Sequence, residues 1–323
     1  MADDQVVSTA LAIANSLPPV VKQNLMTSVS ALFGAIIDVP TAWFEGKAST
    51  IRAKAAADRA SIQSLGQQTD LAISHDPGLA ERAKAAFLNR QFRSQINRET
   101  IAEKTALALQ ENPPPEDTTS HIDPDWLDLF SRISETKSNE AIQTYFARLL
   151  AGEIRKPGTV SPSTIEVLAR ITPDTAKKFE TLCGVTCSIF DISLQSDPLA
   201  AVITAPFGPP GNNALAPFGL SYPVLLELQE SGIVATELNS RWHPPAAALS
   251  KVVIRYGERT FRFEPQSLDD ADQRLAIQML LLTRAGRELR HFVTPSHNTE
   301  YFKALSSWLP DHLGPHGIRT FIE

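Results

Sequence analysis

Apolar residues recur at intervals of three and four along the first third of the chain, a spacing that predicts helices with one buried face. The first stripe lies within residues 23–37, a run without any charge, and consists of Leu25, Val29, Leu32, Phe33 and Ile36. A second stripe follows residues 76–78 and consists of Leu88, Phe92 and Ile96. Residues 47–71 are rich in alanine, arginine, lysine and glutamine, which favour helices. The pattern predicts an extended helical region over residues 1–112.

Three consecutive prolines at 113–115 end this region, because proline cannot continue a helix and holds the chain extended. Beyond them, four polar residues are placed to begin shorter helices, three of them directly before a proline: Asp123, Ser138, Ser161 and Thr172. The segments that follow again carry apolar residues at helical spacing. They predict a compact helical domain over residues 121–186.

The period changes near Cys187, where short β-branched and aromatic runs predict strands. A helix from Tyr222 to Ser231 ends before Gly232, and Ile233 is expected to begin another strand. The pair Gly257-Glu258 separates two strand-like runs and is typical of a hairpin turn. A buried strand at 280–282 and a last helix at 298–309 complete the chain. The predicted fold class is mainly α with an α+β part, in which residues 187–323 form a winged-helix-like C-terminal domain.

Composition and charge narrow the class of protein. Hydrophobic residues make up 43% of the 323 positions and charged residues 20%, which excludes wholesale disorder. The 30 Lys and Arg residues against 36 Asp and Glu residues leave a net charge of −6, which argues against a general nucleic-acid coat protein. The first residues lack the pattern of a secretory signal, and Cys183 and Cys187 suit packing better than a disulfide. We therefore expect a cytoplasmic protein.

The sequence contains no P-loop, no dinucleotide-binding glycine pattern, no nucleophile elbow and no zinc-protease helix motif. His312 and His316 are four positions apart, but Gly314-Pro315 interrupts the helix that would align their rings. No metal site and no cofactor are therefore predicted. Cys183 or Cys187 stays open as a nucleophile, because a partner that is distant in sequence is invisible at this level.

Two blocks of sequence carry a family resemblance. The first contains Asp125-Trp126-Leu127, the run from Tyr145 to Gly158 with its Leu-Ala-Gly-Glu-Ile core, and then Ser161, Thr164, Glu166 and Leu168. The second runs from Leu282 to Leu289 and reads Leu-Thr-Arg-Ala-Gly-Arg-Glu-Leu. Together they resemble the uncharacterised bacterial family named domain of unknown function 2806. That family has no established activity, so the resemblance assigns no catalytic residue, and it implies only a phage-defence or mobile-element setting.

The leading expectation is a non-enzymatic interaction or regulatory protein that binds a protein partner or self-associates. The first alternative is a winged-helix DNA-binding regulator. Its recognition helix would be residues 222–231, which offer Gln229 to base edges but carry two acids and no Lys or Arg. Its wing would bring Arg255, Arg259 and Arg262 to phosphates.

The second alternative is a membrane-surface effector that acts through residues 23–44. A helix that crosses a bilayer needs about twenty apolar residues, so this segment is too short to span but long enough to lie at the interface. The same stripe is also what a helix shows when it is buried against a neighbour or a second copy. The sequence favours the buried or partner-facing interpretation.

Overall fold

The computed structural model describes residues 17–33, 78–112, 119–194, 197–266 and 273–323. The chain divides into two compact units, residues 1–158 and residues 159–323. Neither boundary of the three-part division expected from the sequence, at 112 and at 186, coincides with this one.

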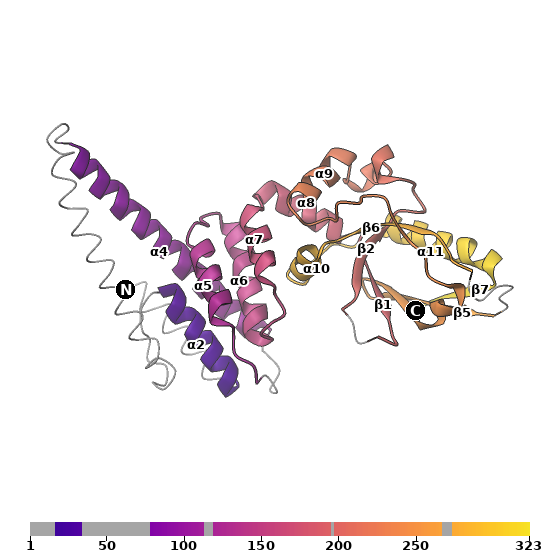
Figure 1. The fold of residues 1–323 in the computed structure, drawn as a ribbon, viewed down its shortest axis with the longest axis horizontal. Helices are drawn as coiled ribbons and strands as arrows, with labels where there is room; N and C mark the ends of the chain where they lie inside the picture. The colour runs from indigo at the N-terminus through magenta and orange to yellow at the C-terminus, as the bar shows by residue number, and fades with distance from the viewer. Residues whose placement is uncertain (1–16, 34–77, 113–118, 195–196, 267–272) are drawn as a thin grey trace. The chain divides into compact units, whose positions relative to one another are not determined.

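The first unit is helical and contains α2 (Pro19–Phe33), α4 (Leu79–Glu111), α5 (Pro124–Ser134) and α6 (Glu140–Arg155) (Figure 1). Asp123 caps α5 through its side chain, as its position before a proline predicts, whereas α6 is capped by Asn139 rather than by the expected Ser138. The C-terminal half of α4 packs against α6, and α2 packs against both α4 and α5. Helices before and after the triple proline therefore share one core.

The stripe on α2 faces that core. Leu25 and Leu32 are completely buried and Val29 is 2% exposed, while the side chain of Phe33 and all of Ile36 lie outside the described residues. Asn24 joins the packing, because its amide donates to the carbonyl of Ser120. The interpretation of this stripe as a membrane or oligomer face is corrected for the three described residues, which are covered by the helices of their own unit.

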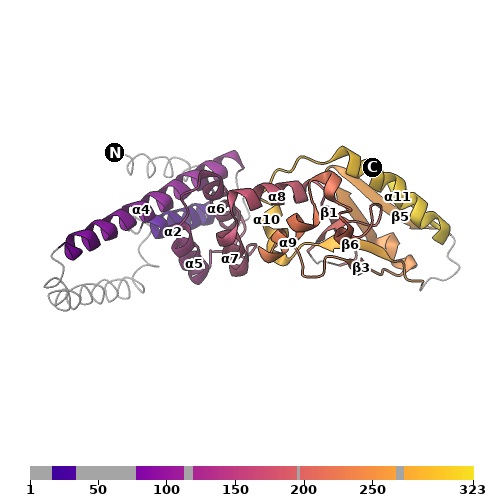
Figure 2. The same ribbon diagram turned by 90° about the horizontal axis from the view of Figure 1, so that it is seen from above.

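The second unit is α+β, with an antiparallel sheet in the order β3-β6-β2-β1-β4-β5-β7. Its strands are β1 (Cys187–Asp191), β2 (Leu199–Ile203), β3 (Ser240–Trp242), β4 (Val252–Tyr256), β5 (Arg259–Pro265), β6 (Ile277–Leu281) and β7 (Ile318–Ile322). Its α-helices are α7 (Pro162–Arg170), α8 (Pro173–Cys183), α9 (Tyr222–Glu230), α10 (Arg284–Arg290) and α11 (Thr299–Leu313). Helix α11 packs against β7, and Figure 2 shows it beside β5. The mixed α+β class of this half is confirmed.

Several predicted elements differ in detail. The strand expected at Ile233 is a single bridge between Val234 and Leu282. The backbone N–H of Val234 is used in the turn after α9, where it donates to the carbonyl of Leu228. The last helix continues past residue 309 to Leu313 and includes Pro310. Cys183 ends α8 and Cys187 begins β1, so the two thiols do not share a helical face.

A partly buried carboxylate attaches α7 to α10. Glu288 on α10 accepts hydrogen bonds from the backbone N–H and the hydroxyl of Ser161 and from the hydroxyl of Thr164, at 2.6 to 3.0 Å. Ser161 precedes α7 and makes no side-chain cap of its own, so Glu288 supplies the acceptor that this helix end needs. These bonds explain why α7 belongs to the second unit.

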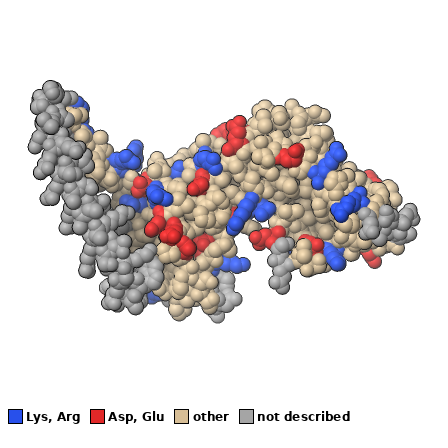
Figure 3. Space-filling view, viewed as in Figure 1, with Lys and Arg blue, Asp and Glu red and all other residues tan. Residues whose placement is uncertain are grey.

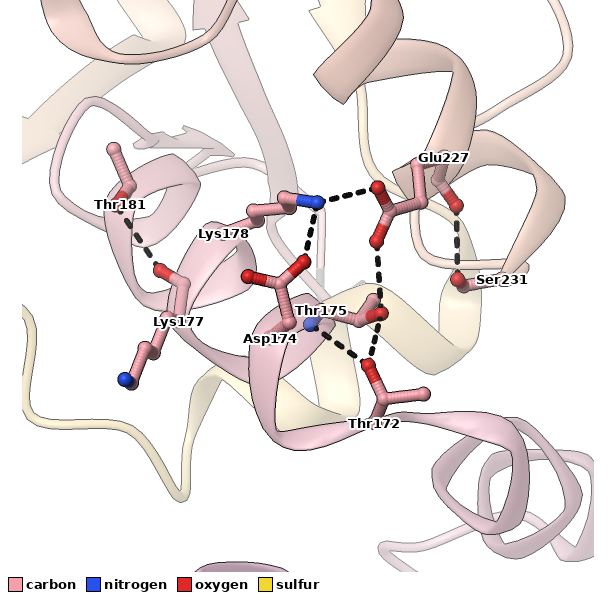
Figure 4. Close-up of polar contacts among 8 residues, drawn as sticks. All are labelled: Thr172, Asp174, Thr175, Lys177, Lys178, Thr181, Glu227 and Ser231. Carbon is pink, nitrogen blue, oxygen red and sulfur yellow. Dashed lines mark hydrogen bonds and ion pairs between the residues drawn. The ribbon is translucent and has the colours of Figure 1, made fainter.

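A second polar network attaches α9 to α8 (Figure 4). Lys178 on α8 pairs with Asp174 on its own helix and with Glu227 on α9. The other oxygen of Glu227 accepts from the hydroxyl of Thr175, which in turn contacts the hydroxyl of Thr172. The polar face of α9 is thus turned toward α8.

Thr283, Gly286 and Glu288 each have a structural role in the Leu282–Leu289 segment. Thr283 caps α10 by accepting from the N–H of Gly286. A Cβ on Gly286 would lie 2.3 Å from the carbonyl oxygen of Ile233, so only glycine permits this close backbone approach. Burial alone would raise the pKa of Glu288, but hydrogen bonds from Thr164, Ser161 and Arg284 outweigh it and hold that pKa below its ordinary value.

Replacing Glu288 with Gln is expected to lower the free energy of unfolding by about 1–3 kcal/mol at pH 7, because the acceptor for α7 is weakened. The folded-state pKa of Glu288 is lowered, so its stabilisation is fully present above the unfolded-state pKa and is lost as the pH falls through the folded-state value. Urea unfolding between acidic and neutral pH should therefore give a difference that shrinks toward the acid end. The exposed carboxylate of Glu264 provides the control Glu264→Gln, and a Glu288→Gln difference that is constant with pH contradicts the role.

Candidate functional site

The second unit contains a cleft of about 780 Å³, which we name the arginine cleft. It is lined by β1, by the β4–β5 hairpin, by the segment between α10 and α11, and by the first turn of α11. Three arginines from different elements line it: Arg255 on β4, Arg259 on β5 and Arg290 at the end of α10.

Each arginine is held by a neighbour. The guanidinium of Arg255 lies over the ring of Phe190 at 5.2 Å from its centroid, and that of Arg259 lies over Phe302 at 5.9 Å. Arg290 donates to the hydroxyl of Ser188 at 2.7 Å and to the carbonyl of Thr186 at 2.9 Å. These contacts reduce the side-chain freedom that the three cations would lose on binding an anion.

Aromatic rings form a second wall of the cleft. Tyr256 stacks nearly parallel to Phe302 with ring centroids 6.0 Å apart, and His297 meets Tyr256 edge to face at 5.1 Å. The hydroxyl of Tyr256 is buried, donates to the carbonyl of Gly184 and accepts from the N–H of Asn298, at 2.6 and 2.7 Å. Burial raises the pKa of this hydroxyl to about 12, so it stays protonated and neutral.

The lining is positively charged. Among the residues that line the cleft, three arginines stand against one carboxylate, Glu258. Burial, and then the charge of Arg290, lower the pKa of both His291 and His297, so neither imidazole adds charge at neutral pH. The cleft therefore favours an anion and disfavours a cation.

The residues predicted to contact DNA or a partner do not form one site. Arg255 and Arg259 lie in the arginine cleft, whereas Arg262, farther along β5, pairs with Glu323. Gln229 lies in a separate pocket of about 370 Å³ beside α9. Sequence reasoning missed Arg290 and Phe302, because neither follows a local motif; only the position of Arg290 directly after the Leu282–Leu289 segment pointed to it.

A family model described as "Protein of unknown function (DUF2806)" matches residues 81–306. The chain belongs to this family. No curated protein and no solved structure matches it. The matched range includes all the arginines of the cleft together with Phe302, and it includes Glu288 with its partners on α7. Both features therefore lie within the part of the chain that defines DUF2806.

A second candidate surface of this DUF2806 protein lies on the N-terminal half of α4. Between residues 87 and 96, four large apolar side chains are open to solvent, with exposed fractions of 57% for Phe87, 42% for Leu88, 66% for Phe92 and 61% for Ile96. Leu88, Phe92 and Ile96 are four residues apart and so share one helix face, with Phe87 at its edge. We name these four residues the α4 apolar face. Exposed apolar patches of this kind mark interaction surfaces.

Charges on the face drawn in Figure 3 are mixed, with Lys and Arg interspersed among Asp and Glu. Within the described ranges, no group of three His, Cys, Asp or Glu side chains is arranged to hold a metal ion. No helix in those ranges combines the length and hydropathy that crossing a bilayer requires.

The two cysteines of this DUF2806 chain lie in the interior. Cys183 and Cys187 are free thiols and are fully buried, and burial raises the pKa of each to about 12. A nucleophilic cysteine needs a lowered pKa and access to substrate. Neither thiol meets those requirements.

Both thiols should react slowly with Ellman's reagent in the native protein at pH 8 and rapidly after unfolding in guanidinium. At a pKa of about 12, roughly one thiol in ten thousand is ionised at this pH, and the protein also blocks the reagent. The absorbance of released thionitrobenzoate gives both rates. A fast native reaction would contradict the burial and restore the nucleophile hypothesis.

Proposed function

We propose that this DUF2806 protein is a non-enzymatic interaction protein that docks a partner through the α4 apolar face. The occupant is an amphipathic helix of another protein, with apolar residues on one side and acidic residues flanking them. The observation that carries the proposal is the exposure of Phe87, Leu88, Phe92 and Ile96 on one helix face. We place this docking in the phage-defence or mobile-element setting that the family resemblance implies.

The chemistry of the partner follows from the charges on the same segment. Residues 79–98 of α4 carry five basic side chains and one acidic side chain, Glu81. A second copy of the same face would bring like charges together, whereas acidic flanks would complement them. A helix face with apolar residues at helical spacing is typically bound by another helix that lies along it. These two features favour an acidic helix over self-association.

Fewer observations support the winged-helix alternative than support the docking proposal. It would use α9 as the recognition helix and the β4–β5 hairpin as the wing. Glu227 on α9 is engaged with Lys178 and Thr175, and none of the residues lining the arginine cleft comes from α9. A recognition helix needs donors free to reach base edges, and here the hairpin arginines line a recess instead.

The docking proposal is tested with two designed helical peptides that share one apolar face and carry either Glu or Lys on their flanks. The acidic peptide should bind the protein at least roughly tenfold more tightly than the basic one at low ionic strength. The double variant Phe92→Glu, Ile96→Glu should weaken that binding by a further factor of roughly ten or more. Fluorescence anisotropy of labelled peptides measures both effects.

The control variant is Ile192→Glu, which changes an isoleucine that is 63% exposed in the second unit. It should bind the acidic peptide as the wild type does. Equal affinity for the two peptides, or equal binding by the α4 variant and the wild type, contradicts the proposal. A concentration-dependent dimer that Phe92→Glu abolishes would also overturn it and assign the face to a second copy.

The protein should bind duplex DNA no better than an unrelated protein of the same net charge. The physical reason is that α9 offers Gln229 but no Lys or Arg to the groove. Anisotropy with random and genomic duplexes across a salt series measures this. Submicromolar, salt-sensitive binding that is lost in Arg255→Ala and Arg259→Ala would promote the DNA-binding regulator instead.

A further inference from the structure

The arginine cleft is not used by the docking proposed for α4, and its chemistry points to a ligand of its own. We propose that the arginine cleft binds a nucleoside phosphate, either free or at the end of a single nucleic-acid strand. The inference stands on the cleft alone and does not depend on what α4 contacts.

The anionic part of the ligand is assigned by the arginines. Arg255 and Arg259 reach the cleft from the two strands of one hairpin, and Arg290 reaches it from α10. Guanidinium groups bind phosphate oxygens through paired N–H donors, which gives both charge and geometry. Arg290 uses two of its five N–H donors on Ser188 and Thr186, and these bonds hold its guanidinium at the lining of the cleft. The lone carboxylate, Glu258, leaves the lining with a surplus of positive charge.

The planar part of the ligand is assigned by the aromatic wall. Phe302 is partly exposed and lies flat against Tyr256, and the exposed residue His297 meets Tyr256 edge to face. Nucleobases stack on aromatic rings and on arginine planes, with roughly 1–3 kcal/mol per base. An acidic peptide would use the arginines but has no planar group to place against the aromatic wall.

The size of the cleft favours a single nucleotide over duplex DNA as the ligand. Its volume of about 780 Å³ falls within the range of small-molecule sites. Duplex DNA is read by a helix or ribbon that enters a groove, whereas these arginines line a hollow between the hairpin and the segment before α11. A single nucleotide or an unpaired strand end can enter such a hollow.

The full-length protein is titrated by isothermal calorimetry with the four nucleoside monophosphates AMP, GMP, CMP and UMP, with the matching nucleosides, and with inorganic phosphate. At least one monophosphate should bind roughly tenfold or more tightly than both its nucleoside and phosphate alone, because phosphate and base are held together. A 5′-phosphorylated single strand compared with its unphosphorylated form distinguishes a strand end from a free nucleotide. Binding of either source supports the site.

Variants separate the two parts of the site. The double variant Arg255→Gln, Arg259→Gln should weaken the best monophosphate by roughly tenfold or more, since it removes two cations. Phe302→Leu should weaken the monophosphate more than inorganic phosphate, because the base loses its stacking ring whereas phosphate loses only the contact that holds Arg259. The control is Arg319→Gln, since Arg319 also lies over a ring, that of Phe321 at 4.9 Å, but does not line the cleft.

Thermal unfolding of each variant verifies that it is folded, which the exposure of Arg255 and Arg259 leads us to expect. Three results would overturn the inference. One is the absence of binding by every monophosphate and strand, and another is unchanged affinity in the double arginine variant. The third is a poly-glutamate peptide that binds more tightly than any monophosphate, which would make the cleft a dock for acidic protein segments.

Discussion

The arginine cleft depends on one buried hydroxyl that holds the segment between α10 and α11 against the end of β4. Tyr256 donates to the carbonyl of Gly184, at the end of α8, and accepts from the N–H of Asn298, which precedes α11. Gly184 is required at this junction, because a Cβ there would lie 2.6 Å from the carbonyl oxygen of Ser296. In the interior, a lost partner costs more than the bond contributes, so this junction is fixed. The cleft is therefore formed before any ligand arrives.

Hydrogen-bonded polar side chains also determine which helices pack in the same unit as the sheet. Tyr301 on α11 is fully buried, and its hydroxyl accepts from the N–H of Ile203 and donates to the carbonyl of the same residue, on β2. Glu288 attaches α7, and the Lys178–Glu227 pair attaches α9 to α8. Apolar burial provides most of the stability, but these satisfied polar groups select one arrangement of the helices. The arginine cleft and the packing of the DUF2806 sequence segments both follow from that arrangement.

Local features of this structure could be predicted from the sequence. Asp123 and Thr172 cap helices as expected, Gly257 opens the hairpin with a positive φ of 59°, and Leu25, Val29 and Leu32 are buried. The sheet order could not be predicted, because β2 pairs with β6 across a long stretch of intervening chain. The boundary near residue 158 was missed for a similar reason, since Glu288 lies 127 positions from Ser161. The two hairpin arginines of the cleft, Arg255 and Arg259, were predicted from the sequence as contact residues. Arg290 and Phe302 were not, because only tertiary packing brings them to the cleft.

The central claim is that a preformed cleft uses arginines for a phosphate and an aromatic wall for a base. A crystal structure grown with the tightest-binding nucleoside monophosphate tests this claim most directly. The account predicts phosphate oxygens within hydrogen-bond distance of at least two of the side chains Arg255, Arg259 and Arg290, and a base against Phe302, with the backbone from 290 to 302 unmoved. A nucleotide bound elsewhere on the molecule, with the arginine cleft empty, would contradict it.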